Sequence, residues 1–255
     1  MSRKFALVTG ASGIVGSGIV HTFLQHTEAS VIAPVRHEQG KSELIEDLAT
    51  LNIDYSSRLH ILVAGNYAEN EESMAEFAKS VKSITPSLDF LVSSFGGAFK
   101  MGTLTSLSAQ DLHQALDRAI PHLFVAKHLA PLLKPSPDSS FTVITGYLGE
   151  VCRMPGMGAL TVANATVFGL LRALEGEYRG SSPVHVVEMR VAAMIRKDKV
   201  EGHPFLKGGT AYPASVLGKV IVKELVSLQQ TNENEAKEQP NIIRVFPGHL
   251  TMGVE

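Results

Sequence analysis

Residues 5–16 read Phe-Ala-Leu-Val-Thr-Gly-Ala-Ser-Gly-Ile-Val-Gly and decide the fold of this chain. An apolar, β-branched run ends at Thr9, and Gly10, Gly13 and Gly16 follow at intervals of three. A glycine at the end of a strand permits a tight turn with positive φ. Because these glycines carry no side chain, the backbone can approach a pyrophosphate, and the next helix offers free N–H groups at its positive end. The stretch therefore predicts a strand, a nucleotide-binding turn and a helix.

Short apolar runs alternate with longer helical stretches along the rest of the chain. The expected strands are Phe5–Thr9, Ser30–Arg36, Leu59–Ala64, Leu88–Ser94, Ser140–Thr145, Val184–Arg190 and Ile242–Phe246. The expected helices cover 14–27, 41–52, 70–84, 108–133, 158–179 and 213–229. Near-continuous apolar strands between helices are typical of a parallel sheet covered on both faces. We predict one Rossmann-type α/β domain over residues 1–255, three layers deep, with strand order 3-2-1-4-5-6-7.

The composition excludes several classes of partner. The 255 residues carry 23 Lys and Arg against 25 Asp and Glu, so the net charge of −2 offers no footprint for nucleic acid or an anionic membrane. The single cysteine, Cys152, suits a reducing compartment. The first apolar run, Phe5–Val8, is too short for a secretory signal. We expect a cytoplasmic protein with no nucleic-acid or membrane partner and no metal site.

The glycine turn after the first strand resembles that of the short-chain dehydrogenase/reductase family. Two further stretches carry the resemblance: Ser93-Ser94-Phe95-Gly96, where the family usually reads Asn-Asn-Ala-Gly, and Phe168-Gly169-Leu170 in a long helix. The resemblance implies a bound nicotinamide dinucleotide. The residues it assigns to the cofactor are Gly10, Ser12, Gly13, Ile14, Gly16, Arg36, Asn66, Ser94, Phe95, Gly96 and Asn164.

The second strand ends in Arg36, where NAD-selective enzymes usually have an acid that accepts from the ribose hydroxyls. An arginine would instead pair with a 2′-phosphate, and Ser12 could add a hydroxyl. We therefore expect NADP(H) in preference to NAD(H). The alternative is that Arg36 is an ordinary surface arginine at the end of a strand.

Several cofactor positions depart from the family pattern. Ile14 stands where glycine is usual, and Asn66 stands where an aspartate would bind adenine. Phe95 replaces a small alanine, so we expect it to crowd the adenosine side. The Pro-Gly pair that follows the sixth strand in the family is absent from 189–192, which read Met-Arg-Val-Ala.

The family's Asn-Ser-Tyr-Lys catalytic tetrad is also absent. When the pattern is carried along this sequence, its four positions hold Arg118, Gly146, Leu160 and Asn164, with Ala119 as the alternative for the first. A small error of register does not rescue the site, because residues 148–177 contain no tyrosine and residues 135–196 no lysine. Glycine and leucine cannot transfer protons. We predict that the usual Tyr-Lys chemistry is absent or very slow.

Other polar residues near these positions are candidates to replace the tetrad. Arg118 and His122 are four residues apart and share a helix face, with Pro121 expected to kink that helix. Tyr147 directly follows Gly146. Each candidate also has a structural reading: Tyr147 and His122 could be packing residues, and Arg118 could pair with Asp117 or Asp111. The loop after the fifth strand adds Cys152 and Arg153, and residues 193–212, with Gly202, Gly208 and Gly209, suit a hinged substrate loop.

Three functions remain open on the sequence alone. The first is an atypical NADP(H)-dependent oxidoreductase that acts on a small organic carbonyl or alcohol. The second is a redox-neutral cyclase, isomerase or lyase, and the third is a non-catalytic NADP(H)-binding regulator. In each case we expect a homodimer or homotetramer formed through the helices near 108–133 and 158–179, which resemble the family's interface helices.

Overall fold

A seven-stranded parallel sheet forms the centre of the computed structural model, which describes residues 3–49, 51, 53–97, 100–152, 154–201, 210–228 and 241–251. Its order is β3-β2-β1-β4-β5-β6-β9, which confirms the predicted order, since β9 is the seventh strand of this sheet along the chain. The strands are β1 (Phe5–Thr9), β2 (Ser30–Val35), β3 (Leu59–Val63), β4 (Phe90–Ser93), β5 (Ser140–Gly146), β6 (His185–Val191) and β9 (Asn241–Val245).

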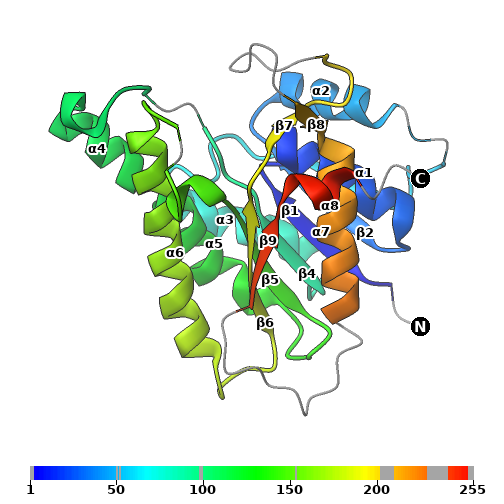
Figure 1. The fold of residues 1–255 in the computed structure, drawn as a ribbon. Coiled ribbons are helices and arrows are strands. Elements are labelled where there is room, and N and C mark those ends of the chain that lie inside the picture. Colours follow the sequence, from blue (N-terminus) through cyan, green and yellow to red (C-terminus); the bar gives the residue numbers. More distant parts are fainter. Residues whose placement is uncertain are drawn as a thin grey trace.

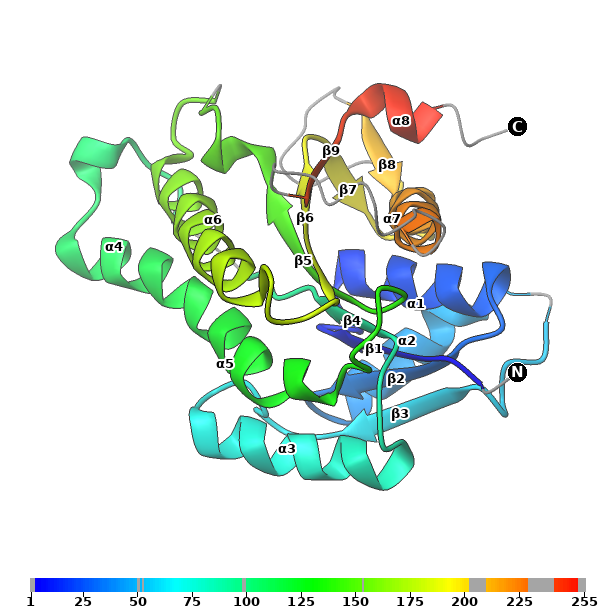
Figure 2. The same cartoon turned by 90° about the horizontal axis from the view of Figure 1, so that it is seen from below.

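Helices cover both faces of the sheet, as Figures 1 and 2 show. One face carries α1 (Ile14–His26), α2 (Glu38–Leu48) and α7 (Ala214–Leu228), and the other carries α3 (Glu71–Ile84), α5 (Ile120–His128) and α6 (Gly158–Tyr178). Side chains of β1 explain both layers, because Ala6 and Val8 point into the first core and Leu7 into the second. All six residues of β2 are buried, as expected for an inner parallel strand.

The region predicted as one helix over 108–133 consists of four shorter pieces. These are α4 (Ala109–Leu116), a 3₁₀ turn at Asp117–Ala119, α5, and a second 3₁₀ turn at Ala130–Leu132. Pro121 is the second residue of α5, a position where the missing N–H costs no helical hydrogen bond. Instead of the expected kink at Pro121, the helix is interrupted just before this residue. Arg118 lies in the interruption, in the 3₁₀ turn at Asp117–Ala119.

Two small elements were not predicted. Met194–Arg196 (β7) and Ala211–Pro213 (β8) pair in parallel as a separate two-stranded sheet, and Pro247–Thr251 forms the short helix α8. Strand β7 lies within the expected substrate loop of residues 193–212, and β8 begins in it and ends at Pro213. Gly202, Gly208 and Gly209 of that loop are outside the described residues. None of the helices in the described ranges is long and apolar enough to cross a bilayer, and no metal-binding cluster of acidic, histidine or cysteine side chains occurs there.

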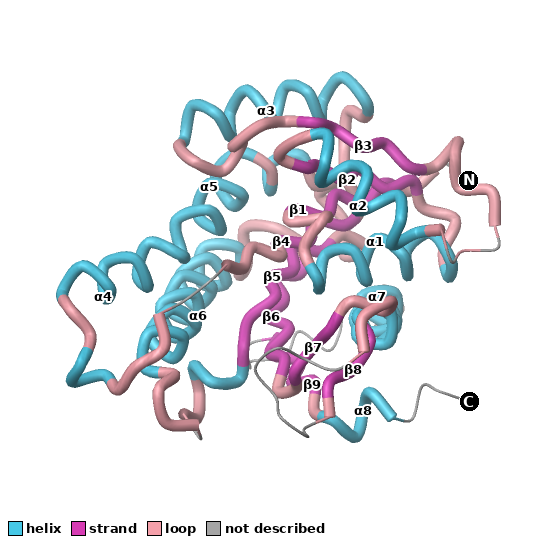
Figure 3. The backbone as a smooth tube through the Cα atoms, turned by 90° about the horizontal axis from the view of Figure 1, so that it is seen from above, coloured by secondary structure: helices cyan, strands magenta, loops and turns pink. Residues whose placement is uncertain are grey.

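Helix α1 is held against α7 by a close crossing of two glycines, and Figure 3 shows the two helices side by side. A Cβ on Gly18 would lie 2.1 Å from the carbonyl oxygen of Ala214, and one on Gly218 would lie 2.2 Å from that of Gly18. No larger residue fits at this crossing without moving a helix. The crossing therefore fixes α1, whose N-terminus forms part of the candidate site.

Candidate functional site

The turn between β1 and α1 has the geometry that its glycines predict. Gly10 has a φ of +67°, and a Cβ there would lie 2.3 Å from the carbonyl oxygen of Ser94. A Cβ on Gly16 would lie 2.1 Å from the carbonyl oxygen of Gly10, which also accepts the N–H of Gly13 at 2.9 Å. Both positions are strictly limited to glycine. The turn therefore depends on backbone packing as well as on access for a ligand.

The N-terminus of α1 offers free hydrogen-bond donors. Its N-cap, Gly13, has no side chain to bond the first turn, and Ser17 is the first residue whose N–H is taken up, by Gly13. The N–H groups of residues 14–16 have no partner within the described ranges. Free N–H groups at the positive end of a thirteen-residue helix suit a phosphate. The residues of this turn thus fit the pyrophosphate of a dinucleotide.

Ser12 and Arg36 lie at the start of α2, beside this turn. A Cβ on Gly40, in the first turn of α2, would lie 3.4 Å from the Ser12 hydroxyl oxygen, so Ser12 borders that helix. His37 caps α2 through Nδ1, which accepts the N–H of Gly40 at 3.1 Å. Arg36 is exposed and forms no ion pair with any residue that the structure describes. Its cation is therefore available to an external anion.

Tyr67 is a residue of this region that the sequence analysis missed. Its hydroxyl oxygen accepts the N–H of Gly10 at 3.1 Å, so the side chain braces the glycine turn from below. Burial raises the pKa of Tyr67 to about 12, which keeps the hydroxyl protonated. The sequence feature that could have pointed to Tyr67 is its position directly after Asn66 and just beyond β3.

Phe95 joins this brace to the neighbouring pocket. Its ring centroid lies 5.9 Å from that of Tyr67 and 5.7 Å from that of His122. The ring is partly buried against these two neighbours, and it lines the pocket described below. Phe95 thus packs between Tyr67 and His122, and its expected crowding of the adenosine side stays a prediction.

The other predicted cofactor residues form the edge of the same groove. Asn66 is exposed, and its carbonyl oxygen accepts the N–H of Glu69. Ser94 donates its N–H to the Thr9 hydroxyl oxygen at 3.3 Å and brings its own carbonyl against Gly10. Gly96 is exposed with no atom near a notional Cβ. Ile14 is also exposed, at 40% of its surface, although glycine is usual there.

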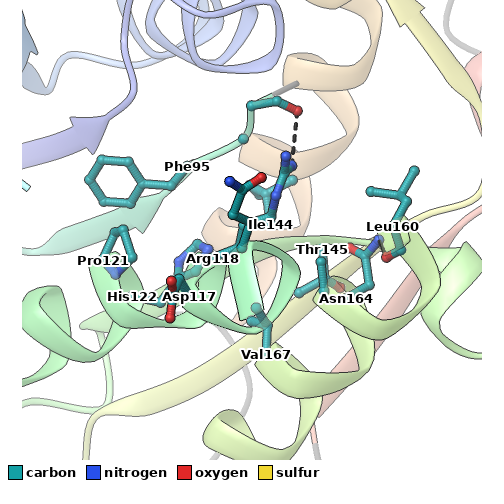
Figure 4. Close-up of a pocket in the computed structure, with 14 residues that line it drawn as sticks. Phe95, Asp117, Arg118, Pro121, His122, Ile144, Thr145, Leu160, Asn164 and Val167 are labelled. Atoms are coloured by element: carbon teal, nitrogen blue, oxygen red, sulfur yellow. Dashed lines mark hydrogen bonds between the residues drawn. The ribbon is translucent and has the colours of Figure 1, made fainter. Parts of the chain in front are cut away.

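A pocket of about 360 Å³ lies where the resemblance places the catalytic tetrad (Figure 4). Three of the four tetrad positions, Arg118, Leu160 and Asn164, line it. The lining residues come from the loop after β4, from α4 to α5, from β5 and from α6: Phe95, Gly96, Gly97, Gln114, Asp117, Arg118, Pro121, His122, Ile144, Thr145, Leu160, Ala163, Asn164 and Val167.

Asn164 uses its side chain to join α6 to the end of β5. Its Oδ1 accepts the N–H of Gly146 at 2.7 Å, and its Nδ2 donates to the carbonyl oxygen of Leu160 at 2.9 Å. A Cβ on Gly146 would lie 3.0 Å from both of these side-chain atoms. Gly146 and Asn164 are therefore a matched pair, and the amide takes a structural role where the resemblance places a lysine.

Arg118 reaches from the 3₁₀ turn across the pocket, and Figure 4 marks its one hydrogen bond to a described residue, from Nη1 to the carbonyl oxygen of Gly97 at 2.9 Å. It forms no ion pair with Asp117 or Asp111, both of which the sequence left as possible partners. Asp111 instead caps α4 through Ser108 and pairs with Lys100. Partial burial lowers the pKa of the Arg118 guanidinium, which still remains charged.

His122 lies at the base of the pocket and is only 3% exposed. Its Nδ1 lies 2.8 Å from the hydroxyl oxygen of the buried Ser93. Burial lowers the pKa of His122 to about 4, so the imidazole is neutral at physiological pH. His122 therefore cannot act as a protonated general acid, the role for which it was a candidate, but it can still form hydrogen bonds.

The remaining candidates lie away from the pocket or outside the described residues. Tyr147 begins a 3₁₀ turn after β5, and its ring packs edge-to-face on Phe246 with centroids 5.4 Å apart. It is not among the residues that line the pocket. Cys152 is exposed, and Arg153 lies outside the described residues.

A buried ionic network lies behind the pocket and was not predicted. Glu188 of β6 is 1% exposed at its side chain and accepts from Arg172, Arg190 and Thr145. The Arg190 guanidinium also stacks 3.7 Å from the Phe168 ring and bonds Glu150. The network connects β5, β6 and α6, so Thr145, at the pocket wall, has its hydroxyl proton already in use.

Comparisons with known proteins agree with this geometry. A family model described as enoyl-(acyl carrier protein) reductase matches residues 10–187. The oxidoreductase UcpA of Escherichia coli K12 is 26% identical over 182 residues, which cover 71% of this chain and 66% of UcpA, just under two thirds of that relative's length.

Solved structures share the fold at low identity. An alcohol dehydrogenase from Thermococcus sibiricus, complexed with 5-hydroxy-NADP, superposes with a TM-score of 0.74 at 16% identity, covering 96% of both chains. An NADPH-bound short-chain oxidoreductase from Pseudomonas aeruginosa PAO1, described as containing an atypical catalytic center, gives a TM-score of 0.63 at 19% identity over 77% of this chain and 73% of that one. The glycine turn, the sheet order and the family match together show that this chain belongs to the short-chain dehydrogenase/reductase superfamily.

Proposed function

We propose that this protein is an NADP(H)-dependent oxidoreductase that acts on a small organic carbonyl or alcohol without the usual catalytic tetrad. The observation that carries the proposal is a phosphate cradle of backbone N–H groups beside a defined pocket. The cradle consists of the glycine turn with the free N–H groups of α1, and the pocket lies between β5, α5 and α6. A protein that kept only the fold, without binding a nucleotide and a substrate, would need neither the free N–H groups nor the pocket.

NADP(H) is favoured over NAD(H) by the surroundings of Arg36. Arg36 has no partner within the described ranges and lies next to the α2 start that Ser12 borders. A 2′-phosphate there would gain charge-assisted hydrogen bonds, whereas an unmodified ribose would leave the arginine unpaired. The two structural neighbours named above are described as a 5-hydroxy-NADP complex and an NADPH complex, which agrees with this preference.

In the reaction, the bound nucleotide would supply or accept a hydride at the carbon of the substrate carbonyl or alcohol. In reduction the oxygen of that carbonyl takes its proton from water, and the products are the alcohol and the oxidised cofactor. Leu160 and Gly146 cannot transfer a proton, and the amide of Asn164 is held by Gly146 and Leu160. Arg118 and His122 would polarise or orient the substrate. Because general acid catalysis is missing, we expect the rate to be lower by a factor of roughly 10²–10⁴ than with it.

The cofactor proposal is tested by calorimetry with NADPH and NADH. We expect NADPH to bind at least about tenfold more tightly, and Arg36→Ala to remove that gap by weakening NADPH alone. Arg179→Ala, a change at an exposed arginine of the α6 C-cap, is the matched control and should leave both affinities unchanged. Equal binding of both nucleotides by the unmodified protein would reject the NADP preference.

The reaction is tested by following NADPH consumption with a panel of small ketones and aldehydes. Slow consumption with stoichiometric alcohol supports the oxidoreductase. Product formation without a change in NADPH would instead indicate a redox-neutral enzyme, and nucleotide binding with no product would indicate a regulator. A cytoplasmic location is part of the same proposal, since it supplies the reduced cofactor.

We also propose that the protein is a homodimer or homotetramer. The α4–α5 segment exposes Leu116, Ile120 and Leu123, at 38%, 40% and 45% of their surfaces. Leu116 ends α4, and Ile120 and Leu123 lie in α5 directly after the 3₁₀ turn. The neighbouring helix α6 exposes the small residues Ala165 and Gly169, which allow a close approach by a second copy. Light scattering at micromolar concentration should give at least twice the 27.4 kDa chain mass, and a monomer mass would contradict this.

A further inference from the structure

The contact between Ser93 and His122 determines which atom His122 presents to the pocket. Ser93 is completely buried at the end of β4, and its hydroxyl has no other hydrogen-bond partner among the described residues. If Nδ1 of His122 were the donor, the hydroxyl proton of Ser93 would be buried without an acceptor, which costs about 1–3 kcal/mol. The satisfied arrangement has Ser93 donating to Nδ1. The neutral ring then carries its proton on Nε2.

This Nε2–H group faces the pocket. His122 lines it, and Nε2 has no hydrogen-bond partner in the described parts of the chain. We place Nε2 toward the pocket because the ring lines it and Nδ1 is taken up by Ser93. The base of the pocket therefore presents one neutral donor.

Arg118 presents further donors to the same space. Its guanidinium carries five N–H groups, of which one is bonded to Gly97. No carboxylate within the described residues lies at ion-pair distance from it. A partly buried arginine with free donors and no counter-ion suits the planar, bidentate geometry of a carboxylate.

No other polar side chain that lines the pocket in the described chain forms a hydrogen bond or an ion pair with these donors. Both side-chain atoms of Asn164 and the hydroxyl of Thr145 already have partners. Asp117 lies on the exposed rim and is the one carboxylate among the lining residues of the described chain. Gln114 adds an exposed amide, and the rest of the wall is apolar, formed by residues such as Leu160 and Ile144.

We infer that this pocket binds the carboxylate of the substrate, with Arg118 and the Nε2–H of His122 as its donors, and that the substrate is a small oxo acid or hydroxy acid with an apolar chain. The inference rests on the proposed function, because it names the substrate class at the same site. The pocket volume of about 360 Å³ is at the small end for ligand sites. Ser93 acts as a positioning residue that fixes the orientation of the imidazole.

The test uses probes that cannot be reduced, so that it is independent of hydride transfer. Calorimetry compares 4-methylpentanoate with 4-methylpentanamide, a neutral compound of the same shape, and with inorganic phosphate, in the presence and absence of NADP. We expect the carboxylate to bind at least tenfold more tightly than the amide and than phosphate. Equal binding of acid and amide would overturn the inference, and phosphate binding as tight as that of the carboxylate would overturn the assignment to a carboxylate.

Variants then locate the donors. Arg118→Met should reduce the affinity for the carboxylate to that for the amide, Arg118→Lys should retain part of the preference, and Arg179→Met should change neither. An acid preference that survives Arg118→Met would place the anion elsewhere. All variants are compared at equal thermal stability, and Arg118→Lys tests the site if Arg118→Met folds poorly.

Nitrogen NMR of the histidine rings provides a separate readout. We expect His122 to show a protonated Nε2 in the unmodified protein, and Ser93→Ala to lose this single tautomer and weaken carboxylate binding. A protonated Nδ1 in the unmodified protein would overturn the donor assignment. If the carboxylate binds while NADPH does not, the anion site stands and the proposed oxidoreductase function fails. If NADPH binds while the carboxylate does not, the inferred carboxylate site is rejected and the oxidoreductase proposal stands.

Discussion

The β1–α1 turn and the β5–α6 junction lie along one edge of the same sheet, yet they relate to the family pattern in opposite ways. At the first, Gly10, Gly13 and Gly16 keep the pattern, and the backbone has the form the pattern predicts. At the second, Gly146 and Asn164 stand where the resemblance places catalytic residues, and they bond to each other. The comparison teaches that the glycine turn is constrained by backbone geometry, whereas the β5–α6 junction is held by side-chain contacts.

The β5–α6 side of the site departs from the expected pattern most in where its charges lie. The α6 position where the resemblance places a lysine holds the neutral Asn164, and the cation that lines the pocket is Arg118 on the opposite wall. Behind the pocket, Glu188 and Arg190 form a buried ionic network on β6. Buried ions of this kind are costly to separate. We therefore expect the β5–α6 junction to depend on side-chain electrostatics more than the glycine turn does.

Removing the central carboxylate should give the largest effect. Glu188→Gln leaves Arg190 and Arg172 without their shared partner, and removal of one member of a buried pair costs about 3–5 kcal/mol. Urea unfolding measures the loss. Glu76→Gln, which breaks the exposed pair with Lys79, is the control and should cost less than about 1 kcal/mol. Similar losses for the two variants would show that the network contributes no more than a surface pair.

Filling the glycine turn should give the next largest effect. Gly16→Ala places a methyl group 2.1 Å from the carbonyl oxygen of Gly10, so the turn must shift. We expect a loss of about 2–3 kcal/mol, as for other overpacked sites, together with loss of NADPH binding. Gly176→Ala in α6, where nothing lies within 4 Å of the added carbon, should instead be neutral or stabilise by about 0.5 kcal/mol. Unchanged nucleotide affinity in Gly16→Ala would show that the turn is not the binding site.

The same contrast explains how far the sequence could predict this structure. The sheet order and the glycine turn could be predicted because period, strand length and the absence of a Cβ are local properties. The break before Pro121 was read only as a kink, since the proline alone does not say whether the chain bends or restarts a helix. The separate β7–β8 pair joins residues far apart in the chain and carries no local pattern.

The site was predictable in its residues but not in their partners. Sequence reasoning identified Arg118, His122 and Asn164, but the partners Gly97, Ser93 and Gly146 depend on tertiary packing. Tyr67 was missed because nothing local shows that its hydroxyl meets Gly10, 57 residues earlier. Glu188 and Arg190 were read as parts of an ordinary strand, since a buried ion pair is visible only when both partners are placed.

The acid dependence of stability should show that the pocket holds a neutral histidine. The folded pKa of His122, about 4, lies below the ordinary 6.5, so the unfolded chain binds more protons between these values. The contribution is complete above pH 6.5 and is lost as the pH falls toward 4. Arg118 and Asp117 are the charged side chains of the described residues that line the same pocket.

Urea unfolding at pH 7 and pH 5 measures this contribution. Between pH 7 and pH 5, the free energy of unfolding should fall by up to about 2 kcal/mol more in the unmodified protein than in His122→Gln, whose glutamine cannot titrate. Burial also lowers the pKa values of His21, His60 and His185, so only the difference between the two proteins is interpreted. Exposed His113→Gln is the control and should follow the unmodified protein. Parallel losses in unmodified and His122→Gln proteins would mean that His122 is not kept neutral by the fold.

The smallest expected effect tests whether Gly146 and Asn164 changed together. A Cβ on Gly146 would lie 3.0 Å from the Asn164 amide, a contact that the amide can relieve only by a small shift. Gly146→Ala alone should therefore cost about 1 kcal/mol, partly because it disturbs the 2.7 Å bond from the Gly146 N–H. In the Asn164→Ala background the same change meets no amide and should cost little. The two changes should then be coupled by roughly 0.5–1 kcal/mol in a double-mutant cycle, because they share one contact. Additive costs would mean that the glycine is tolerated for reasons unrelated to Asn164. Coupling would mean that a serine cannot return at position 146 while Asn164 remains, so the two tetrad positions would have to be restored together.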